Sequence, residues 1–405
     1  MNQPTRKNNK IKLPDGWRVV VARNFEEIET FRPTWEQMQC GESLPAPNVD
    51  IYRYLSVVES MKEAVQPHIM LLSYEGKPKV MVIGRIERRQ ITCRVGYFTV
   101  LKPSLRCLTI LYGGILGRPS DEVCVILLQE LINTLRHGEV DVTFFNHLLI
   151  DSHLIKTMTN FLCRDHFPTL DLHWQTHIPE SVEAFYKMIP SKHKREWRRC
   201  ERKLAEEGNG PVKVVCYRNE EEIDYIMEVA CEISVLTYKD GMNIGIVDDS
   251  LTRALLRQAA RDGWLRAYIL YVNSVPCAFE FGVRYNATFF PEYMGYDPKW
   301  CSFGPGALLW VKVIEDLCVD ATIDTLDYGF GDAAYKERLG TKSWPEASVY
   351  IFAPRLYPVF INILQSSTRS LSLGLECVLR RIGLIHWVKR CWRNLLQAKN
   401  PKSVP

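Results

Sequence analysis

The sequence predicts a protein of the α/β fold class with mixed sheets, and three observations support this. Short apolar runs typical of strands alternate along the chain with longer segments of helical spacing. Several of these runs follow one another through tight turns, as the strands of hairpins do. A helix then leads to the next run, which fits a crossover connection between parallel strands. At 405 residues, the chain is long enough for two domains with separate hydrophobic cores.

The first domain is expected over residues 17–175, after a polar tail of residues 1–16. Its hairpin turn is Glu75-Gly76-Lys77-Pro78, where Gly and Pro favour a chain reversal. The expected strands are 17–22, 67–74, 79–86 and 140–146, and the expected helical segments are 25–39, 50–64, 122–137 and 151–162.

The second domain is expected over residues 176–354, and a strongly basic helix stands at its start. Because its charges occupy several faces, this helix is predicted to lie at the surface. Its basic residues are Lys192, Lys194, Arg195, Arg198, Arg199, Arg202 and Lys203. After a break at 208–211, the expected strands are 212–217, 264–272, 276–284, 287–295, 323–329 and 346–353, and the expected helices are 219–234, 248–261, 304–319 and 332–338.

Residues 355–405 are expected to be a basic, amphipathic helical extension. One broad face carries Leu371, Leu375, Leu379, Ile382, Ile385, Val388, Trp392 and Leu395. Such a helix could pack on the protein or on a partner. It could also lie on an anionic membrane surface through residues 371–396, with Trp387 and Trp392 beside basic side chains.

Composition favours a reducing compartment and says little about partners. The net charge is only +4, and the 13 cysteines are scattered without metal-ligand spacing, so we expect no metal. The start of the chain has no apolar signal region, and no run of 18 uncharged apolar residues occurs. We therefore expect a cytoplasmic protein, with peripheral contact at the inner face of a membrane as the alternative.

The most informative stretch runs from Gly295 to Gly340. Gly304-Pro305-Gly306 stands where a predicted strand passes into a predicted helix. Glycine lets the backbone approach a ligand, and the unpaired N–H groups and positive dipole of a helix start suit a pyrophosphate. A simple helix start without a ligand is the structural alternative.

These residues resemble the acyl-CoA-binding core of the GNAT acyltransferases, in the double-domain branch of CelD-type and FemAB-like proteins. The resemblance is clearest over roughly 180–350, and its motifs are Tyr296-Asp297, Pro305-Gly306-Ala307-Leu308-Leu309, Asp327, and Gly331-Asp332 followed by Tyr335-Lys336. It implies tandem GNAT-like domains, each with a mixed, mostly antiparallel sheet flanked by helices. It also implies transfer of an acetyl or other acyl group from acyl-CoA to an amine or hydroxyl.

The resemblance further implies a set of cofactor-binding residues. The backbone of Phe303, Gly304, Pro305, Gly306 and Ala307 would hold the pyrophosphate of acetyl-CoA or another acyl-CoA, with Tyr296 at the preceding strand end. Arg195 and Arg199 of the basic helix could bind further phosphates, although a solvated charged face is the default explanation.

Four side chains are the catalytic candidates. Tyr335 would be the proton donor by resemblance, and Asp327 resembles an acidic position of the family. Glu292 and Glu280 each interrupt an apolar strand, where a carboxylate is costly unless it is paired or functional, so both are candidate general bases. A structural ion pair, for instance with Arg284, is the alternative for each of them.

The acceptor and even the donor stay open at this point. CelD-type relatives suggest a small-molecule or sugar-linked acceptor, such as a polysaccharide precursor. FemAB-like relatives suggest an aminoacyl-tRNA donor bound by the basic helix, whereas DNA is not expected. A non-catalytic module of a membrane-associated polysaccharide biosynthesis complex is a third hypothesis, because Cys301 replaces the Gln or Arg usual in the GNAT loop.

Overall fold

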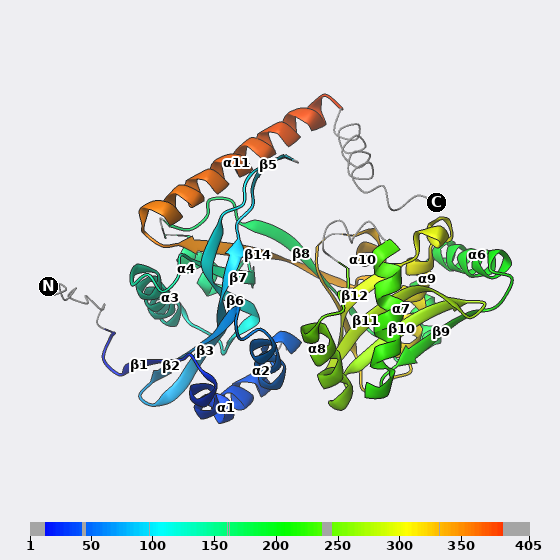
Figure 1. Ribbon diagram of the computed structural model, residues 1–405, viewed down its shortest axis with the longest axis horizontal. Helices are drawn as coiled ribbons and strands as arrows, with labels where there is room; N and C mark the ends of the chain where they lie inside the picture. The colour runs from blue at the N-terminus through cyan, green and yellow to red at the C-terminus, as the bar shows by residue number, and fades with distance from the viewer. Residues whose placement is uncertain are drawn as a thin grey trace. The chain divides into compact units, whose positions relative to one another are not determined.

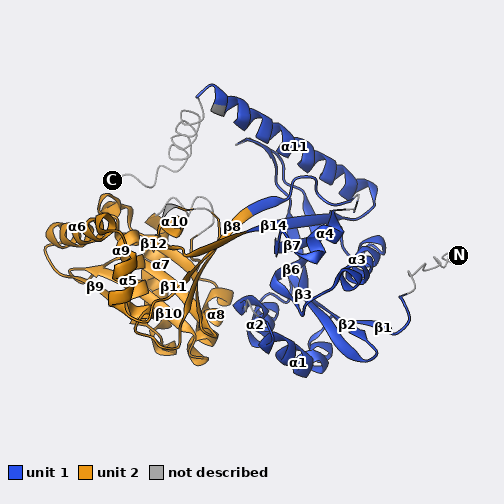
Figure 2. Ribbon diagram, turned by 180° about the vertical axis from the view of Figure 1, so that it is seen from behind, with its two compact units in different colours: residues 1–170, 345–389 blue, residues 171–344, 390–405 orange. Residues whose placement is uncertain are grey.

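The computed structural model describes residues 13–42, 46–96, 98–159, 161, 163–236, 245–331 and 333–383. The chain divides into two compact units (Figure 2). Unit 1 comprises residues 1–170 and 345–389, and unit 2 comprises residues 171–344 and 390–405. The expected boundaries at 175 and 354 differ from this division, because residues 345–354 belong with unit 1.

Unit 1 is built on a mixed sheet with the strand order β1-β2-β3-β6-β7-β14 (Figure 1). Only β6 and β7 run parallel, and the other neighbours within this order are antiparallel. The strands are β1 (Trp17–Ala22), β2 (Val65–Tyr74), β3 (Lys77–Gln90), β6 (Ser104–Leu116), β7 (Val142–Leu149) and β14 (Lys342–Phe352), with a separate hairpin of β4 (Cys93–Val95) and β5 (Phe98–Leu101). The helices are α1 (Phe25–Cys40), η1 (Pro47–Val49), α2 (Ile51–Ser60), α3 (Asp121–Arg136), α4 (His153–Met158) and α11 (Leu356–Arg381).

Unit 2 repeats this plan with the strand order β8-β13-β12-β11-β10-β9. Here β12 and β13 are the parallel pair. The strands are β8 (Thr169–His177), β9 (Val212–Tyr217), β10 (Leu265–Val272), β11 (Val275–Tyr285), β12 (Thr288–Tyr296) and β13 (Thr325–Phe330). The helices are α5 (Val182–Met188), α6 (Ser191–Glu207), η2 (Glu220–Glu222), α7 (Ile223–Leu236), α8 (Ser250–Arg261), η4 (Pro298–Phe303), α9 (Pro305–Leu317) and α10 (Ala334–Leu339).

The two units therefore share one topology, with α3 and α9 as equivalent crossover helices between the parallel strands. This confirms the expected α/β class with tandem mixed sheets. In unit 2, α9 covers one sheet face with an apolar core that includes Leu308, Trp310 and Ile314. Helices α7 and α8 cover the other face with a second core. None of the helices in the described ranges combines the length and apolarity that crossing a bilayer requires.

The pairing of two strands corrects the expectation. The strand expected at 346–353 does not complete the sheet of unit 2, because Glu346 to Phe352 pair with β7 of unit 1. The corresponding place beside β13 is taken by β8, which the sequence did not predict as a strand. Pairing partners are far apart in the chain, so the local pattern of hydrophobicity does not specify them.

Candidate active site

The parallel strands β12 and β13 stay paired for only a short distance. Their register joins Thr288 to Thr325 and Phe289 to Leu326, after which β12 continues with β11 and β13 with β8. A narrow cavity of about 40 Å³ lies where they have separated. Its lining comes from β11, β12 and α9, and comprises Phe279, Glu280, Met294, Gly295, Tyr296, Gly306, Leu309 and Trp310. The cavity exceeds the ~10–15 Å³ that a water molecule needs, so it can hold a small group.

A β-bulge shapes the strand that leads into this cavity. Gly282 of β11 pairs with Pro291, while the neighbouring Phe281 pairs with Tyr293, so Glu292 is the extra residue of β12. Bulges re-aim the residues that follow them. The structure thus places the candidate base Glu292 at the bulge, partly buried, and outside the lining of the cavity.

Helix α9 begins at the cavity with its amide groups free of side-chain caps. Gly304 is the N-cap residue in the left-handed region at φ +67°, and Pro305 follows as the first helical residue. No side chain of the described residues caps the N–H groups of this helix start. A Cβ at Gly306 would lie 3.5 Å from Cδ1 of Tyr296, which places both residues side by side at the cavity wall. Phe303 and Ala307, the other residues of the expected clamp, stand on either side of this helix start in the sequence.

Tyr335 packs against the same cavity wall. Its ring stacks on Trp310 with 5.4 Å between the ring centroids and 19° between the planes. Its hydroxyl lies 4.0 Å from Sδ of Met294. Burial, and next the negative charge of Glu280, raise the pKa of Tyr335 above its ordinary value of 10. The hydroxyl is thus protonated at neutral pH.

Glu280 brings a carboxylate into the cavity. Its side chain is only 2% exposed, and in the sheet it stands opposite Met294 on β12 and Tyr268 on β10. Trp310 adds a buried donor, because its Nε1 has no hydrogen-bond partner among the residues described. The cavity therefore combines a carboxylate, an indole N–H and a helix start in one place.

Asp327 has a different position from the other candidates. Its carboxylate accepts hydrogen bonds from Gln175 at 2.9 Å and from the N–H of Gly329 at 2.7 Å, and it pairs with His173 at 2.7 Å. These contacts join β13 to β8 and hold the backbone where the register of β13 shifts between Asp327 and Gly329. Lys336 donates to the carbonyl oxygen of Phe330, the last residue of β13, at 2.5 Å, whereas Asp332 lies outside the described residues.

The basic helix α6 lies beside the start of α9. A Cβ at Gly304 would come within 3.5 Å of Sγ of Cys200, and Glu201 pairs with Lys312 of α9 at 3.6 Å. Arg195 and Arg199 occur on the exposed part of α6. The helix thus brings positive charge near the open N–H groups of α9.

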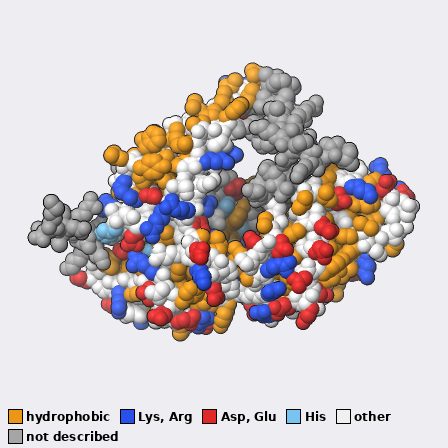
Figure 3. Space-filling model, viewed as in Figure 1, with side chains coloured by type: hydrophobic (Ala, Val, Ile, Leu, Met, Phe, Trp, Pro, Cys, Tyr) orange, Lys and Arg blue, Asp and Glu red, His pale blue; other side chains and the backbone are white. Residues whose placement is uncertain are grey.

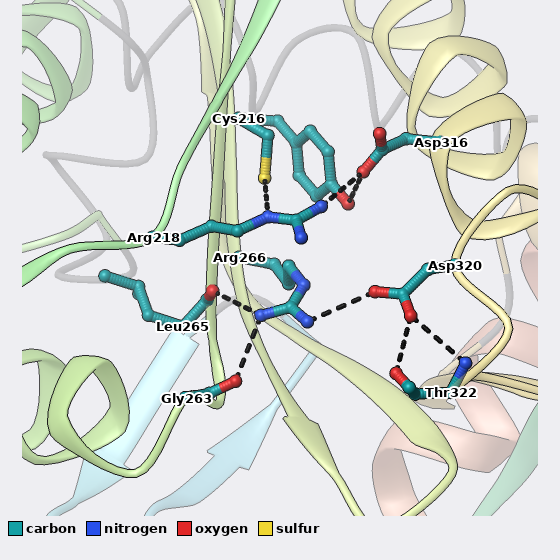
Figure 4. A network of polar contacts seen from close by, with 9 residues as sticks. Cys216, Arg218, Gly263, Leu265, Arg266, Asp316, Asp320 and Thr322 are labelled. Carbon is teal, nitrogen blue, oxygen red and sulfur yellow. Dashed lines mark hydrogen bonds and ion pairs between the residues drawn. The ribbon is translucent and has the colours of Figure 1, made fainter.

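A second cavity of about 420 Å³ lies at the other end of α9 (Figure 4). Arg218 pairs with Asp316 and Arg266 with Asp320, each at 3.2 Å, and Tyr268 donates to Asp316 at 2.8 Å. Arg284 also lines this cavity, at the opposite end of the helix from the first one. The paired charges tie the end of α9 to β9 and β10, which is a structural role.

Sequence reasoning overlooked Trp310, Met294 and Leu309. Their apolar helical and strand patterns made them look like core residues, although the position of Trp310 four residues after Gly306 places it on the same side of the helix as the clamp. No cluster of three or more potential metal ligands is found in the part of the chain that the structure describes.

Comparison with known proteins agrees with this geometry. Residues 191–337 match the family model described as an acetyltransferase (GNAT) domain. The crystal structure of FemX superposes with a TM-score of 0.52 and 9% identity, over 78% of this chain and 95% of that chain. For a tandem GNAT protein from the clavulanic acid biosynthesis pathway, the TM-score is 0.47 and the identity 10%, over 84% and 100% of the two chains. None of the curated protein sequences compared with this chain matches it.

The match of residues 191–337 covers the whole cavity, from the basic helix to Tyr335. The likeness to FemX shows a shared fold over most of both chains. Residues 191–337 are therefore a GNAT acetyltransferase domain by their family match, and the chain as a whole shares the fold of FemX.

Proposed function

We propose that the protein transfers an acyl group from acyl-CoA to an amine, with unit 2 as the catalytic unit. The observation that carries this proposal is the convergence of an uncapped helix start, a buried carboxylate and a protonated tyrosine on one cavity. The helix start would bind the CoA pyrophosphate through the N–H groups of Gly306 and Ala307. The thioester would lie where β12 and β13 separate.

In this proposal the side chains divide the proton transfers between them. The amine nitrogen attacks the thioester carbon, the C–S bond breaks, and Tyr335 donates its proton to the departing thiolate. Glu280 accepts the proton that the amine loses. Because Glu280 lies close to Tyr335, it can then pass this proton to the deprotonated tyrosine. Trp310 Nε1 offers a hydrogen bond to an oxygen of the bound thioester.

The acceptor we propose is an amine on a small or sugar-linked molecule, and the reaction would take place in the cytoplasm. The twelve cysteines described are all free, which fits a reducing compartment. The sugar rests only on the resemblance to CelD-type proteins.

An aminoacyl-tRNA donor is the second candidate, and one observation favours it. Helix α6 exposes Arg195 and Arg199 beside the site, where a nucleic-acid backbone could be bound. If Arg195→Glu with Arg199→Glu abolishes tRNA binding and leaves acetyl-CoA binding unchanged, this second donor gains support.

Calorimetric titration with acetyl-CoA tests the main proposal. The wild-type protein is expected to bind, and Gly306→Asp to bind about 100-fold more weakly, because its carboxylate would repel the pyrophosphate at the helix start. The matched control is Gly306→Ala, whose Cβ fits beside Tyr296 and adds no charge. Absence of binding by the wild type at millimolar acetyl-CoA would contradict the proposal.

A further inference from the structure

Helix α11 is fixed to unit 1 by one of its faces. Ile361 and Thr368 are buried there. Asn362 donates to the carbonyl oxygen of Arg164 at 3.1 Å. Further along, the hydroxyl of Ser372 donates to the carbonyl of Arg94 at 3.0 Å and accepts from the N–H of Gly96 at 2.9 Å. These contacts hold the helix along much of its length.

The outward face of the same helix is apolar. Seven of the large exposed side chains here recur every three or four residues, apart from a gap at Ser367, so these seven form one stripe along the helix. They are between 49% and 94% exposed, and comprise Leu356, Phe360, Ile363, Leu371, Leu375, Val378 and Ile382. Figure 3 shows hydrophobic side chains gathered along this helix.

This apolar stripe is long and straight. At 1.5 Å per residue, the 26 residues of α11 extend about 39 Å. The neighbouring hairpin adds exposed Phe98 and Val100 on β5, close to the contact between Gly96 and Ser372. Soluble monomers rarely expose apolar patches of this extent, so the stripe indicates a binding surface.

The charges of α11 and of the sequence that follows it identify the partner of the stripe. Arg369 and Arg381 are exposed on α11. Beyond Glu376, the sequence contains no Asp or Glu, while it contains Arg380, Arg381, Lys389, Arg390, Arg393, Lys399 and Lys402. A second copy would bring the same positive charge to the interface and be repelled. An anionic surface would be attracted, by about 1 kcal/mol for each basic residue near a charged membrane.

We propose that the apolar stripe of α11 lies on the surface of an anionic lipid bilayer, with the basic residues contacting the headgroups. Since the helices described are unable to span a bilayer, the contact is interfacial. The acyl-transfer cavity is formed by unit 2, so this proposal does not depend on the proposed function.

Co-sedimentation of the full chain with vesicles tests the proposal. Binding to phosphatidylcholine vesicles with about 30% phosphatidylglycerol should exceed binding to pure phosphatidylcholine vesicles at least tenfold, and salt should weaken it by screening. Ile363→Gln with Leu371→Gln should reduce binding at least tenfold. The matched control, Val235→Gln with Val275→Gln, removes exposed valines from unit 2 and should bind as the wild type does.

Three outcomes would overturn the proposal. The wild type could show equal or no binding to both kinds of vesicle, a comparison that does not depend on how the variants fold. The stripe variant, shown to be folded by circular dichroism, could bind as tightly as the wild type. Finally, sedimentation equilibrium could reveal a dimer that the stripe variant dissociates, which would assign the stripe to a second copy of the chain.

Discussion

The crossover helices α3 and α9 occupy the same place in the two units, yet their first turns differ. Helix α3 follows Ser120 and begins with Asp121 and Glu122, and the carboxylate of Asp121 contacts Nδ1 of His153 at 2.6 Å. Helix α9 follows Gly304 and begins with Pro305 and Gly306, with no acidic residue in its first turn.

This difference shows how one topology can carry two kinds of helix start. Acidic side chains stabilise a helix by complementing the positive end of its dipole, and they also repel an incoming anion. Unit 1 thus complements the dipole at the start of α3 with its own acidic residues, although no side chain caps that start. The start of α9 has no such charge, which is why our proposal places acyl-CoA binding in unit 2 and not in unit 1.

The largest expected effect concerns Tyr335 of α10, since α4, the helix after β7 in unit 1, contains no tyrosine. Tyr335→Phe should lower kcat for release of CoA thiol from acetyl-CoA by about 100-fold or more, because general-acid catalysis is lost. Because the pKa of Tyr335 is raised, the wild-type tyrosine stays protonated up to pH 9, and the loss should be equal at pH 7 and pH 9.

Tyr328→Phe is the matched control for this prediction. Tyr328 packs on the rings of Trp310 and Tyr335, but it does not line the cavity. Its loss of a hydroxyl should change kcat less than threefold. Similar losses in both variants would show that the aromatic cluster acts by packing alone.

The next prediction separates the two carboxylates. Glu280→Gln should lower kcat about 30-fold with little change in acetyl-CoA affinity, because the proton acceptor is removed while the side-chain shape is retained. Glu292→Gln, at the bulge, should retain at least a third of the activity. If steady-state kinetics show the larger loss of kcat for Glu292→Gln, the general base is Glu292 on β12 and not Glu280.

The local sequence pattern predicted most helices and strands of both units. It also predicted the meeting of Tyr296, Gly306 and Tyr335, because these belong to motifs that follow one another along the chain. The strand exchange was not predictable, since β14 pairs with residues 142–149 and nothing local to 346–352 specifies that partner.

The same limit explains why the sequence did not reveal the contacts of Asp327. Its partner His173 lies on β8, a strand whose mixed polar and apolar residues were not recognised. Trp310 was missed for a different reason, because an apolar residue on a helix is usually part of the core. Only the cavity reveals that its N–H group is buried without an acceptor among the described residues.

A smaller effect is expected at β14, which a buried aspartate holds in place, as Asp327 holds β8 in unit 2. In unit 1, Asp165 accepts from the N–H of Tyr350 on β14 at 3.1 Å, and burial raises its pKa from 3.8 to about 6. A raised pKa in the folded state means that stability is lost as pH rises from about 4 through 6. Asp165→Asn avoids this loss. The free energy of unfolding of this variant minus that of the wild type should therefore be about 1–3 kcal/mol larger at pH 8 than at pH 5.

Urea unfolding at the two pH values measures this change. Asp151→Asn alters an exposed aspartate and serves as the control, with no dependence of the difference on pH. If the difference in free energy of unfolding between Asp165→Asn and the wild type is the same at pH 5 and pH 8, the carboxylate of Asp165 is ionised in the folded protein at both pH values. That result would contradict the prediction.

The smallest effect is expected when the acidic start of α3 is neutralised. Asp121→Asn with Glu122→Gln removes the repulsion in unit 1 and leaves the start of α9 unchanged, so acetyl-CoA affinity and stoichiometry should stay within twofold of the wild type. A second binding event per chain in calorimetry would instead mean that charge alone had kept acyl-CoA away from unit 1. The two helix starts would then differ in acyl-CoA binding only through their acidic residues.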